Sequence, residues 1–201
     1  RRLRTLAAVA LLLAGCGGAP VSPGTPAPSP SPSVTPAPAS EPLRYVAMGD
    51  SYTIGDELPR QVDRWPNQLV RALRPGVSLQ LVDNLAGQSH GTTEVIEVQL
   101  PVLEELDADL VSLQVGVNDV VISGGLTDEE YRANLVGILD GVDGPTPATS
   151  HAGILDLVSP GRVFLVTTPD YTLAPDRRYD RPGAAETVAR FNDILRELAA
   201  E

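Results

Sequence analysis

Between residues 43 and 201, short apolar segments alternate with helix-like segments, and this alternation limits the fold more than any other feature of the sequence. The apolar segments are rich in Val, Leu and Tyr and are bounded by Gly, Pro, Asp or Asn, as is typical of strands covered on both faces of a sheet. Alternating strands and helices indicate parallel βαβ units. We predict strands at residues 43–48, 78–82, 109–115 and 162–167, and helices at residues 68–73, 93–106, 128–139 and 184–198.

Three local signals refine these expected elements. Thr127 and Glu130 have the spacing of a capping box at the start of the third helix, where each side chain satisfies a free backbone donor of the other. Pro101 should kink or split the second helix, because it lacks an N–H and clashes with the preceding turn. Residues 143–160 contain three prolines and are expected to form an irregular surface loop.

The first forty residues have the pattern of an export signal followed by a tether. Three arginines precede an apolar run at residues 6–13, which is too short to span a bilayer but matches the apolar region of a secretory signal. The run ends in Leu-Ala-Gly-Cys, which resembles the lipobox of bacterial lipoproteins. The resemblance implies that residues 1–15 are a signal peptide and that Cys16 is lipidated. The alternative is a buried apolar helix with an incidental cysteine.

Residues 16–42 are dominated by Pro, Ser, Ala, Thr and Gly, a composition that cannot bury enough apolar area to fold. We expect a disordered, semi-rigid linker that reaches roughly 70 Å in polyproline II geometry. With a lipid on Cys16, the protein would be exported and anchored to the membrane of a bacterial cell envelope. Its globular domain, residues 43–201, would face away from the cytoplasm.

Charge and composition exclude several partners. The formal net charge is −11, and an acidic surface repels both the phosphates of nucleic acids and anionic lipid headgroups. Any membrane contact should therefore come from the lipid anchor. A single cysteine excludes an intrachain disulfide. We see no metal cluster and no nucleotide or cofactor motif, so no cofactor is expected, and we favour a monomer.

Two polar blocks follow expected strands directly. Gly49, Asp50 and Ser51 come after the first strand, and Gly116-Val117-Asn118-Asp119 comes after the third. A serine on a strand-to-helix turn at the carboxyl edge of a parallel sheet is exposed where such folds bind ligands. The structural alternatives are an Asp-Ser helix cap for the first block and an Asn-Asp turn for the second.

The two blocks, with residues 84–93 between them, resemble those of the SGNH/GDSL hydrolases. The resemblance covers residues 43–201 and implies a flavodoxin-like three-layer α/β/α sandwich around a parallel sheet. It makes Ser51 the nucleophile, Asn118 an oxyanion donor and Asp50 and Asp119 supporting residues. The family's second block has Gly five residues after Asn, whereas Ser89 follows Asn84 at that distance. Whether the backbone N–H of Gly87 or of Ser89 joins that of Ser51 in the oxyanion hole therefore stays open.

The family's last block, Asp-x-x-His, carries the general base and is absent from this sequence. Neither His90 nor His151 has an aspartate three residues before it. His90 either lines the site or is a solvated loop residue, and we favour the solvated loop for both histidines. Because the sequence opens with Arg and stops inside an expected helix, we expect a chain truncated at both ends. The missing part would contain the last strand and the base, and the fragment would be nearly inactive.

The resemblance implies a serine hydrolase that cleaves short acyl or acetyl esters through an acyl-enzyme on Ser51. The substrate would be a small-molecule or glycan ester. Residues 168–175 resemble a stretch of a bacterial subgroup of the family, and they either line the substrate crevice or form a structural loop. Two alternatives keep the same fold: a non-catalytic lipoprotein that binds glycans or lipids, and an acyltransferase that acts on polysaccharide hydroxyls.

Overall fold

The structure is a computed structural model that describes residues 41–201 except positions 56, 75, 123, 147–148 and 177–178. The expected signal peptide, the lipidation site Cys16 and all but the last two residues of the expected linker lie outside the described residues. Within the described part, no helix is both long enough and apolar enough to cross a membrane.

Four parallel strands form one sheet in the order β2-β1-β3-β4. All four predicted strands are present, and each end lies within two residues of its predicted position. β4 is shorter than predicted and forms one edge of the sheet. The strands are β1 (Leu43–Gly49), β2 (Leu79–Asn84), β3 (Leu110–Gln114) and β4 (Val163–Leu165).

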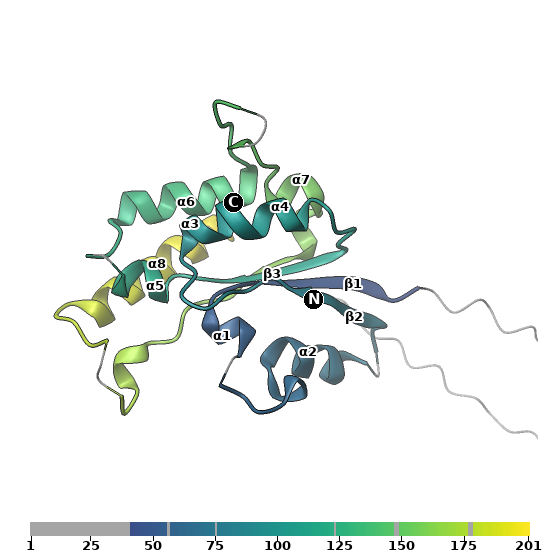
Figure 1. The fold of residues 1–201 in the computed structure, drawn as a ribbon, viewed down its shortest axis with the longest axis horizontal. Coiled ribbons are helices and arrows are strands. Elements are labelled where there is room, and N and C mark those ends of the chain that lie inside the picture. The colour runs from purple at the N-terminus through teal and green to yellow at the C-terminus, as the bar shows by residue number, and fades with distance from the viewer. Residues whose placement is uncertain (1–40, 56, 75, 123, 147–148, 177–178) are drawn as a thin grey trace, which may run out of the picture. The chain divides into compact units, whose positions relative to one another are not determined.

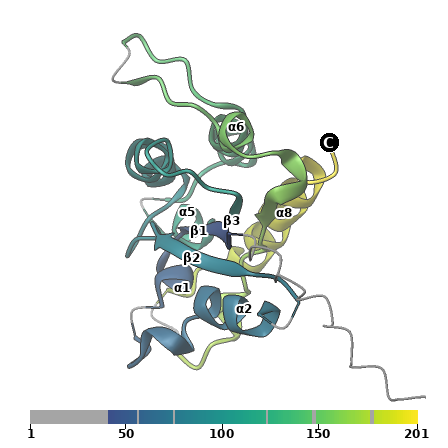
Figure 2. The same ribbon diagram turned by 90° about the vertical axis from the view of Figure 1, so that its right-hand side faces the viewer.

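Helices cover both faces of the sheet, so the predicted three-layer α/β/α sandwich is confirmed (Figures 1 and 2). One face carries α1 and α2 and the other carries α3, α4, α6 and α8, while α5 and α7 occupy connections after strand β3 and helix α6. The helices are α1 (Ser51–Ile54), α2 (Trp65–Leu73), α3 (Thr92–Glu94), α4 (Leu100–Leu103), α5 (Val117–Val121), α6 (Asp128–Asp140), α7 (Ile154–Leu157) and α8 (Ala184–Leu198). Shorter turns are the 3₁₀ helices η1 (Gln61–Asp63), η4 (Pro160–Arg162) and η5 (Tyr171–Leu173) and the π-helix η2 (Val95–Gln99).

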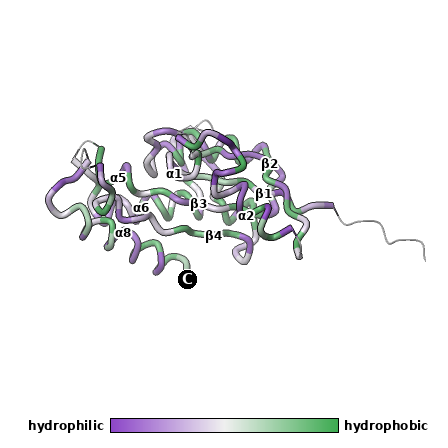
Figure 3. The backbone as a smooth tube through the Cα atoms, turned by 90° about the horizontal axis from the view of Figure 1, so that it is seen from below, coloured by the Kyte–Doolittle hydropathy of each residue, from purple (hydrophilic) through white to green (hydrophobic). Residues whose placement is uncertain are grey.

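The alternation of side chains along β1 divides the core into two parts. Tyr45 and Ala47 point to the face covered by α2, and Val46 and Met48 point to the larger cluster under α6 and α8. All four side chains are fully buried. In Figure 3, α8 alternates between hydrophilic and hydrophobic residues along its turns, which is the pattern of a helix with one face in the core.

The predicted capping box is confirmed. Glu130 donates its backbone N–H to Thr127 Oγ1 at 3.2 Å, and Thr127 donates its N–H to Glu130 Oε2 at 2.9 Å. These bonds lower the pKa of the Glu130 carboxyl, because they favour its charged form. They fix the start of α6 shortly after residues 116–119, which follow β3 and are the third polar block.

The second predicted helix is interrupted, as Pro101 suggested. The segment runs as α3, the π-helix η2 and α4, and Pro101 lies in the first turn of α4, where its missing N–H costs least. The loop expected at residues 143–160 is wrong in part. It contains α7, whose buried Ile154 packs into the larger core cluster, and this tertiary contact orders a segment that its prolines predicted to be irregular.

Candidate functional site

The polar blocks meet at the carboxyl edge of the sheet. Ser51 is the first residue of α1, directly beyond β1, and Asn118 lies in α5, directly beyond β3. β1 and β3 are neighbours, with Gly49 opposite Gln114 at their carboxyl ends. The structure therefore brings Ser51 and Asn118 to the same edge from adjacent strands, which is where open α/β folds bind ligands.

The turn before Ser51 requires glycine. Gly49 has φ of +138°, and a side chain there would overlap the carbonyl of Gln114 on the neighbouring strand. Asp50 then donates its backbone N–H to that same carbonyl at 3.2 Å. The close approach of the two backbones places the first polar block tightly against the end of β3.

Asp50 is the N-cap of α1, because its Oδ1 accepts the backbone N–H of Tyr52 at 2.9 Å. The capping interpretation is thus correct for Asp50, and it is compatible with a role for Ser51. As the first residue of the helix, Ser51 has a backbone N–H without an intrahelical acceptor. That N–H makes no hydrogen bond to any residue between 41 and 201 that the structure describes.

Asp50 is fully buried, and its second carboxyl oxygen, Oδ2, has no hydrogen-bond partner among the described residues. Burial raises the pKa of this carboxyl to about 7, with a smaller upward contribution from the negative charge of Asp119. The hydrogen bond from Tyr52 acts in the opposite direction. A carboxyl group next to the serine is therefore largely protonated below neutral pH.

Residues 84–93, the second block, bear on the choice between Gly87 and Ser89. Gly87 donates its N–H to the carbonyl oxygen of Gly49 at 3.1 Å, so that donor is already engaged. Ser89 has φ of +60°, a strained conformation for a residue with a side chain, and strain of this kind is concentrated at functional sites. In the described part of the chain its N–H has no acceptor. Asn84 supports the block by donating its Nδ2 to the carbonyl of Thr53 at 3.0 Å.

The third block is nine-tenths buried and connected to the second. Asn118 donates its Nδ2 to the carbonyl oxygen of His90 at 2.8 Å, which leaves one more amide hydrogen for another acceptor. Asp119 accepts hydrogen bonds from the backbone N–H of Thr92 at 2.9 Å and from its hydroxyl at 2.6 Å. Burial raises the pKa of Asp119, and the bonds from Thr92 oppose that shift.

The two histidines lie in different places. The expectation that His90 is a solvated loop residue is wrong in part: it lies in a loop, but it is half-buried, its Nδ1 lies 2.9 Å from Nε2 of the buried Gln99, and its ring packs on Gly87. His151 pairs with Val142 on the loop between α6 and α7, and its Nδ1 is 3.7 Å from a carboxylate oxygen of Glu104. It therefore lies beside the connection that leads from α4 to the beginning of β3, not beyond the carboxyl ends of the strands.

Residues 168–175 are partly structural. Thr168 is buried, and its hydroxyl donates to the carbonyl of Val115 at 3.0 Å. Asn192 of α8 exchanges two further hydrogen bonds of 2.8 Å with the backbone of Thr168. Farther along, Leu173 is 81% exposed, whereas Tyr171 is buried, and burial raises the pKa of its hydroxyl. The start of the segment is therefore fixed to the core, and Leu173 near its end is exposed.

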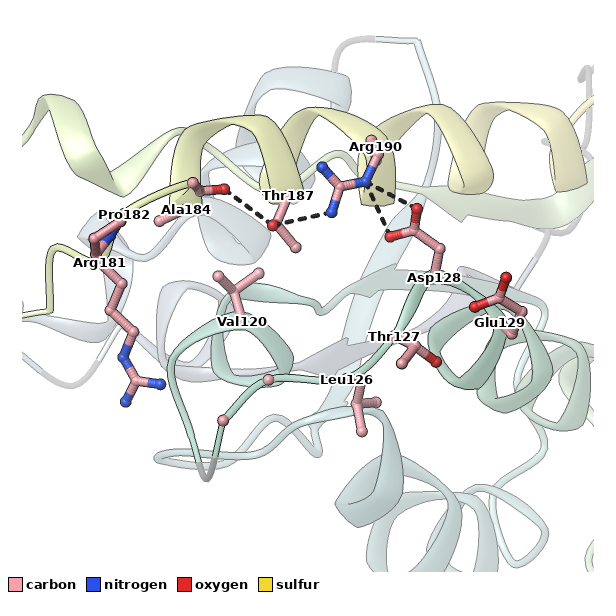
Figure 4. A pocket seen from close by; sticks show the side chains of 13 residues that line it. Val120, Leu126, Thr127, Asp128, Glu129, Arg181, Pro182, Ala184, Thr187 and Arg190 are labelled. Atoms are coloured by element: carbon pink, nitrogen blue, oxygen red, sulfur yellow. Dashed lines mark hydrogen bonds and ion pairs between the residues drawn. The ribbon is translucent and has the colours of Figure 1, made fainter.

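A cavity of about 370 Å³ lies away from Ser51, between the loop that follows α5 and the beginning of α8 (Figure 4). Arg190 dominates its wall, but the guanidinium is already bound to the Asp128 carboxylate at 2.8 Å and to the Thr187 hydroxyl at 3.2 Å. The lining contains no serine and no histidine. This hollow therefore lacks the serine and the histidine that a serine esterase site uses.

Sequence reasoning missed the residues beneath the site, namely Gln99, Thr92 and Asn134. Gln99 is 1% exposed and bonds to Gly49, while Asn134 donates its Nδ2 to the Thr92 hydroxyl at 2.8 Å. The signal available in the sequence was Gln99, a polar residue among the apolar neighbours of segment 95–103. A polar residue at a buried helical position requires a partner, which is a reason to search for one.

A parallel sheet with helices on both faces, a serine on the turn after its first strand and an asparagine beyond its third defines a three-layer α/β/α protein with a polar site at the carboxyl edge. Comparison with known families makes the class specific. The model of the GDSL-like lipase/acylhydrolase family matches residues 47–201, and the chain belongs to this family. It is accordingly a hydrolase that acts on esters.

Solved structures of this fold include AlinE4, an SGNH-hydrolase family esterase, with 21% identity and a TM-score of 0.56 over 80% of this chain and 74% of that chain. An acetyl xylan esterase from Geobacillus stearothermophilus has 17% identity and a TM-score of 0.54 over 80% and 73% of the two chains. A lipase/acylhydrolase from Enterococcus faecalis has 20% identity and a TM-score of 0.51 over 79% and 71%. These likenesses establish the fold. No curated protein sequence matches the chain.

Proposed function

We propose that the chain cleaves short acyl or acetyl esters through an acyl-enzyme formed on Ser51. The observation that carries the proposal is the common position of Ser51 and Asn118 beyond the carboxyl ends of two adjacent strands. Ser51 Oγ would attack the ester carbonyl carbon, the alcohol would leave, and water would then release the acid from the acylated serine.

The negative charge that develops on the carbonyl oxygen needs donors that are already in place. We assign this role to the backbone N–H of Ser51, the backbone N–H of Ser89 and the second amide hydrogen of Asn118. The first two have no acceptor within the described chain, and the third remains after Asn118 bonds to His90. Ser89 replaces Gly87 in this role because the Gly87 N–H is bound to Gly49.

The mechanism also needs a base to take the proton from the Ser51 hydroxyl. His151 is near the opposite edge of the sheet, and the Nδ1 of His90 is bound to Gln99. That an Asp-x-x-His segment beyond Glu201 supplies the base stays a prediction. It is tested by comparing the 201-residue chain with a chain extended through such a segment.

The esterase proposal is tested by hydrolysis of p-nitrophenyl acetate and butyrate and by labelling with a fluorophosphonate, which modifies activated serines. Ser51→Ala should abolish turnover and labelling in the extended form, and any residual turnover and labelling in the 201-residue chain. Ser159→Ala is the matched control, since Ser159 is exposed and its side chain makes no capping bond. Undiminished turnover in Ser51→Ala would refute the assignment of the nucleophile.

We also propose that Cys16 carries the lipid that anchors the protein to the outside of a bacterial membrane. The support is the basic start, the short apolar run and the small residues before the cysteine. A lipoprotein signal peptidase should remove residues 1–15 after acylation. Expression with a clickable fatty acid should label the wild type but not Cys16→Ala, and labelling of that variant would contradict the proposal.

A further inference from the structure

Gln99 connects the helical segment after the second block to the backbone before the nucleophile. It is the last residue of the π-helix η2, and its side chain is 1% exposed. Its Oε1 accepts the N–H of Gly49 at 2.9 Å, and its Nε2 donates to the carbonyl of Gly49 at 2.8 Å. π-turns inside helices are frequent at functional sites, and this one presents its polar side chain two residues before Ser51.

These two bonds determine the hydrogen-bonding state of His90. Because the Gly49 N–H requires an oxygen and the Gly49 carbonyl requires an N–H, the orientation of the Gln99 amide is fixed. The second hydrogen on Nε2 then faces Nδ1 of His90 at 2.9 Å. An amide nitrogen accepts no hydrogen bond, so Nδ1 must be the acceptor and a neutral ring carries its proton on Nε2.

His90 in turn belongs to the segment that carries the Ser89 donor and is bonded to the Asn118 donor of α5. Its carbonyl accepts the Asn118 amide at 2.8 Å, and its backbone N–H bonds to the carbonyl of Gly87 at 3.4 Å. The Nε2 edge of its ring packs so closely on Gly87 that any side chain at position 87 would overlap it. Ser89, with φ of +60°, lies between these two contacts.

We infer that Gln99 and His90 are positioning residues of the ester-hydrolysing site. They hold residues 87–90 in the strained conformation that directs the Ser89 N–H and the Asn118 amide toward one oxygen next to Ser51. The inference rests on the proposed function, because it assigns a purpose to donors that the function requires. Apart from the function, the inference makes two physical claims. His90 Nδ1 accepts a hydrogen bond from Gln99, and the conformation of residues 87–90 depends on that bond.

The first arm of the test needs no activity. A long-range ¹H–¹⁵N spectrum of the full chain distinguishes a protonated from an unprotonated Nδ1, and His151→Gln assigns the signals, since the sequence has two histidines. At a pH where the ring is neutral, His90 should carry its proton on Nε2 alone. Gln99→Met, which keeps the length and removes the amide, should allow both tautomers. A proton on Nδ1 in the wild type would overturn the inference.

The second arm compares substitutions that place an acceptor differently. His90→Asn keeps an oxygen near the position of Nδ1, His90→Gln places one near Nε2, and His90→Leu has none. In the extended, active protein we expect His90→Leu and His90→Gln to lower kcat about 10- to 100-fold with little change in KM. His90→Asn should recover most of the loss. Equal kcat in all three variants, whether normal or reduced, would contradict a positioning role.

The two arms separate this inference from the proposed function. If the extended wild-type protein hydrolyses no ester, the proposed function fails. The inference is then decided by the backbone amide signals of Ser89 and the side-chain signals of Asn118. They should shift in His90→Leu and stay near the wild-type positions in His90→Asn. If His90→Leu does not fold, the comparison of His90→Asn with His90→Gln is made instead. Unchanged signals in every variant would overturn the inference.

Discussion

Asp119 accepts both the backbone N–H and the hydroxyl of Thr92, at 2.9 Å and 2.6 Å. Thr92 begins α3, after the second polar block, and Asp119 lies in α5, within the third. Both residues are buried, so the two blocks are joined by bonds that water does not weaken. This connection keeps the loop with Ser89 at a constant distance from Asn118.

We therefore expect Asp119→Ala to destabilise the protein and reduce activity. The substitution leaves the N–H and hydroxyl of Thr92 without their acceptor in a buried site, which costs about 2–4 kcal/mol of the free energy of unfolding. Denaturation in urea measures this change. Asp119→Asn is the control, because its Oδ1 still accepts from Thr92. Equal losses in the two variants would show that the charge, and not the hydrogen bonds, is what matters.

Asn118→Ala should lower kcat for p-nitrophenyl esters about 10²- to 10³-fold with KM nearly unchanged, because the lost donor acts on charge present only in the transition state. Steady-state kinetics of the extended protein measure both constants. Asn67→Ala, at a half-buried position of α2 away from the polar blocks, is a matched control that should stay at the wild-type rate. A rise in KM without loss of kcat would instead place Asn118 in ground-state binding.

Most of the fold was predictable because local patterns and tertiary structure agree. The strands and the helices α6 and α8 were found from apolar periodicity and caps, and the carboxyl-edge position of Ser51 and Asn118 followed from the order of the elements. Ile154 was missed, because a four-residue helix such as α7 has too few turns to show periodicity and forms through its contact with the core.

The interior of the site was less predictable. The choice between Gly87 and Ser89 depends on which N–H reaches Gly49, and no sequence pattern specifies that contact. Likewise the contact of His90 with Gln99 arises because the π-turn rotates one side chain toward β1. Hydrogen bonds between residues on different elements depend on angles of a few degrees, whereas periodicity reports only which face is buried.

The rings of Phe191 on α8 and Tyr131 on α6 stack with their centroids 3.9 Å apart. This contact allows a test of how α8 packs on α6. Both side chains are almost fully buried. Phe191→Ala should cost about 3–5 kcal/mol of the free energy of unfolding, through lost burial and the cavity that remains. Phe164→Ala is the control: Phe164 on β4 is 48% exposed, and its loss should cost much less. Similar costs for both would show that α8 is not packed on α6 as described.

Asp50 should lower the free energy of unfolding as pH rises. Surface carboxylates whose pKa is lowered have the opposite effect. The buried carboxyl of Asp50 has a pKa raised to about 7, well above that of the unfolded chain, so its full contribution to stability is present below about pH 4 and is lost as pH rises to 7. The loss is on the order of 2–4 kcal/mol. Asp50→Asn keeps the acceptor for Tyr52 and does not titrate, so the variant should gain stability relative to the wild type as pH rises from 4 to 8. Urea denaturation of both proteins at pH 4.5, 6 and 8 measures the difference, and a constant offset at all three values would mean that Asp50 is ionised throughout.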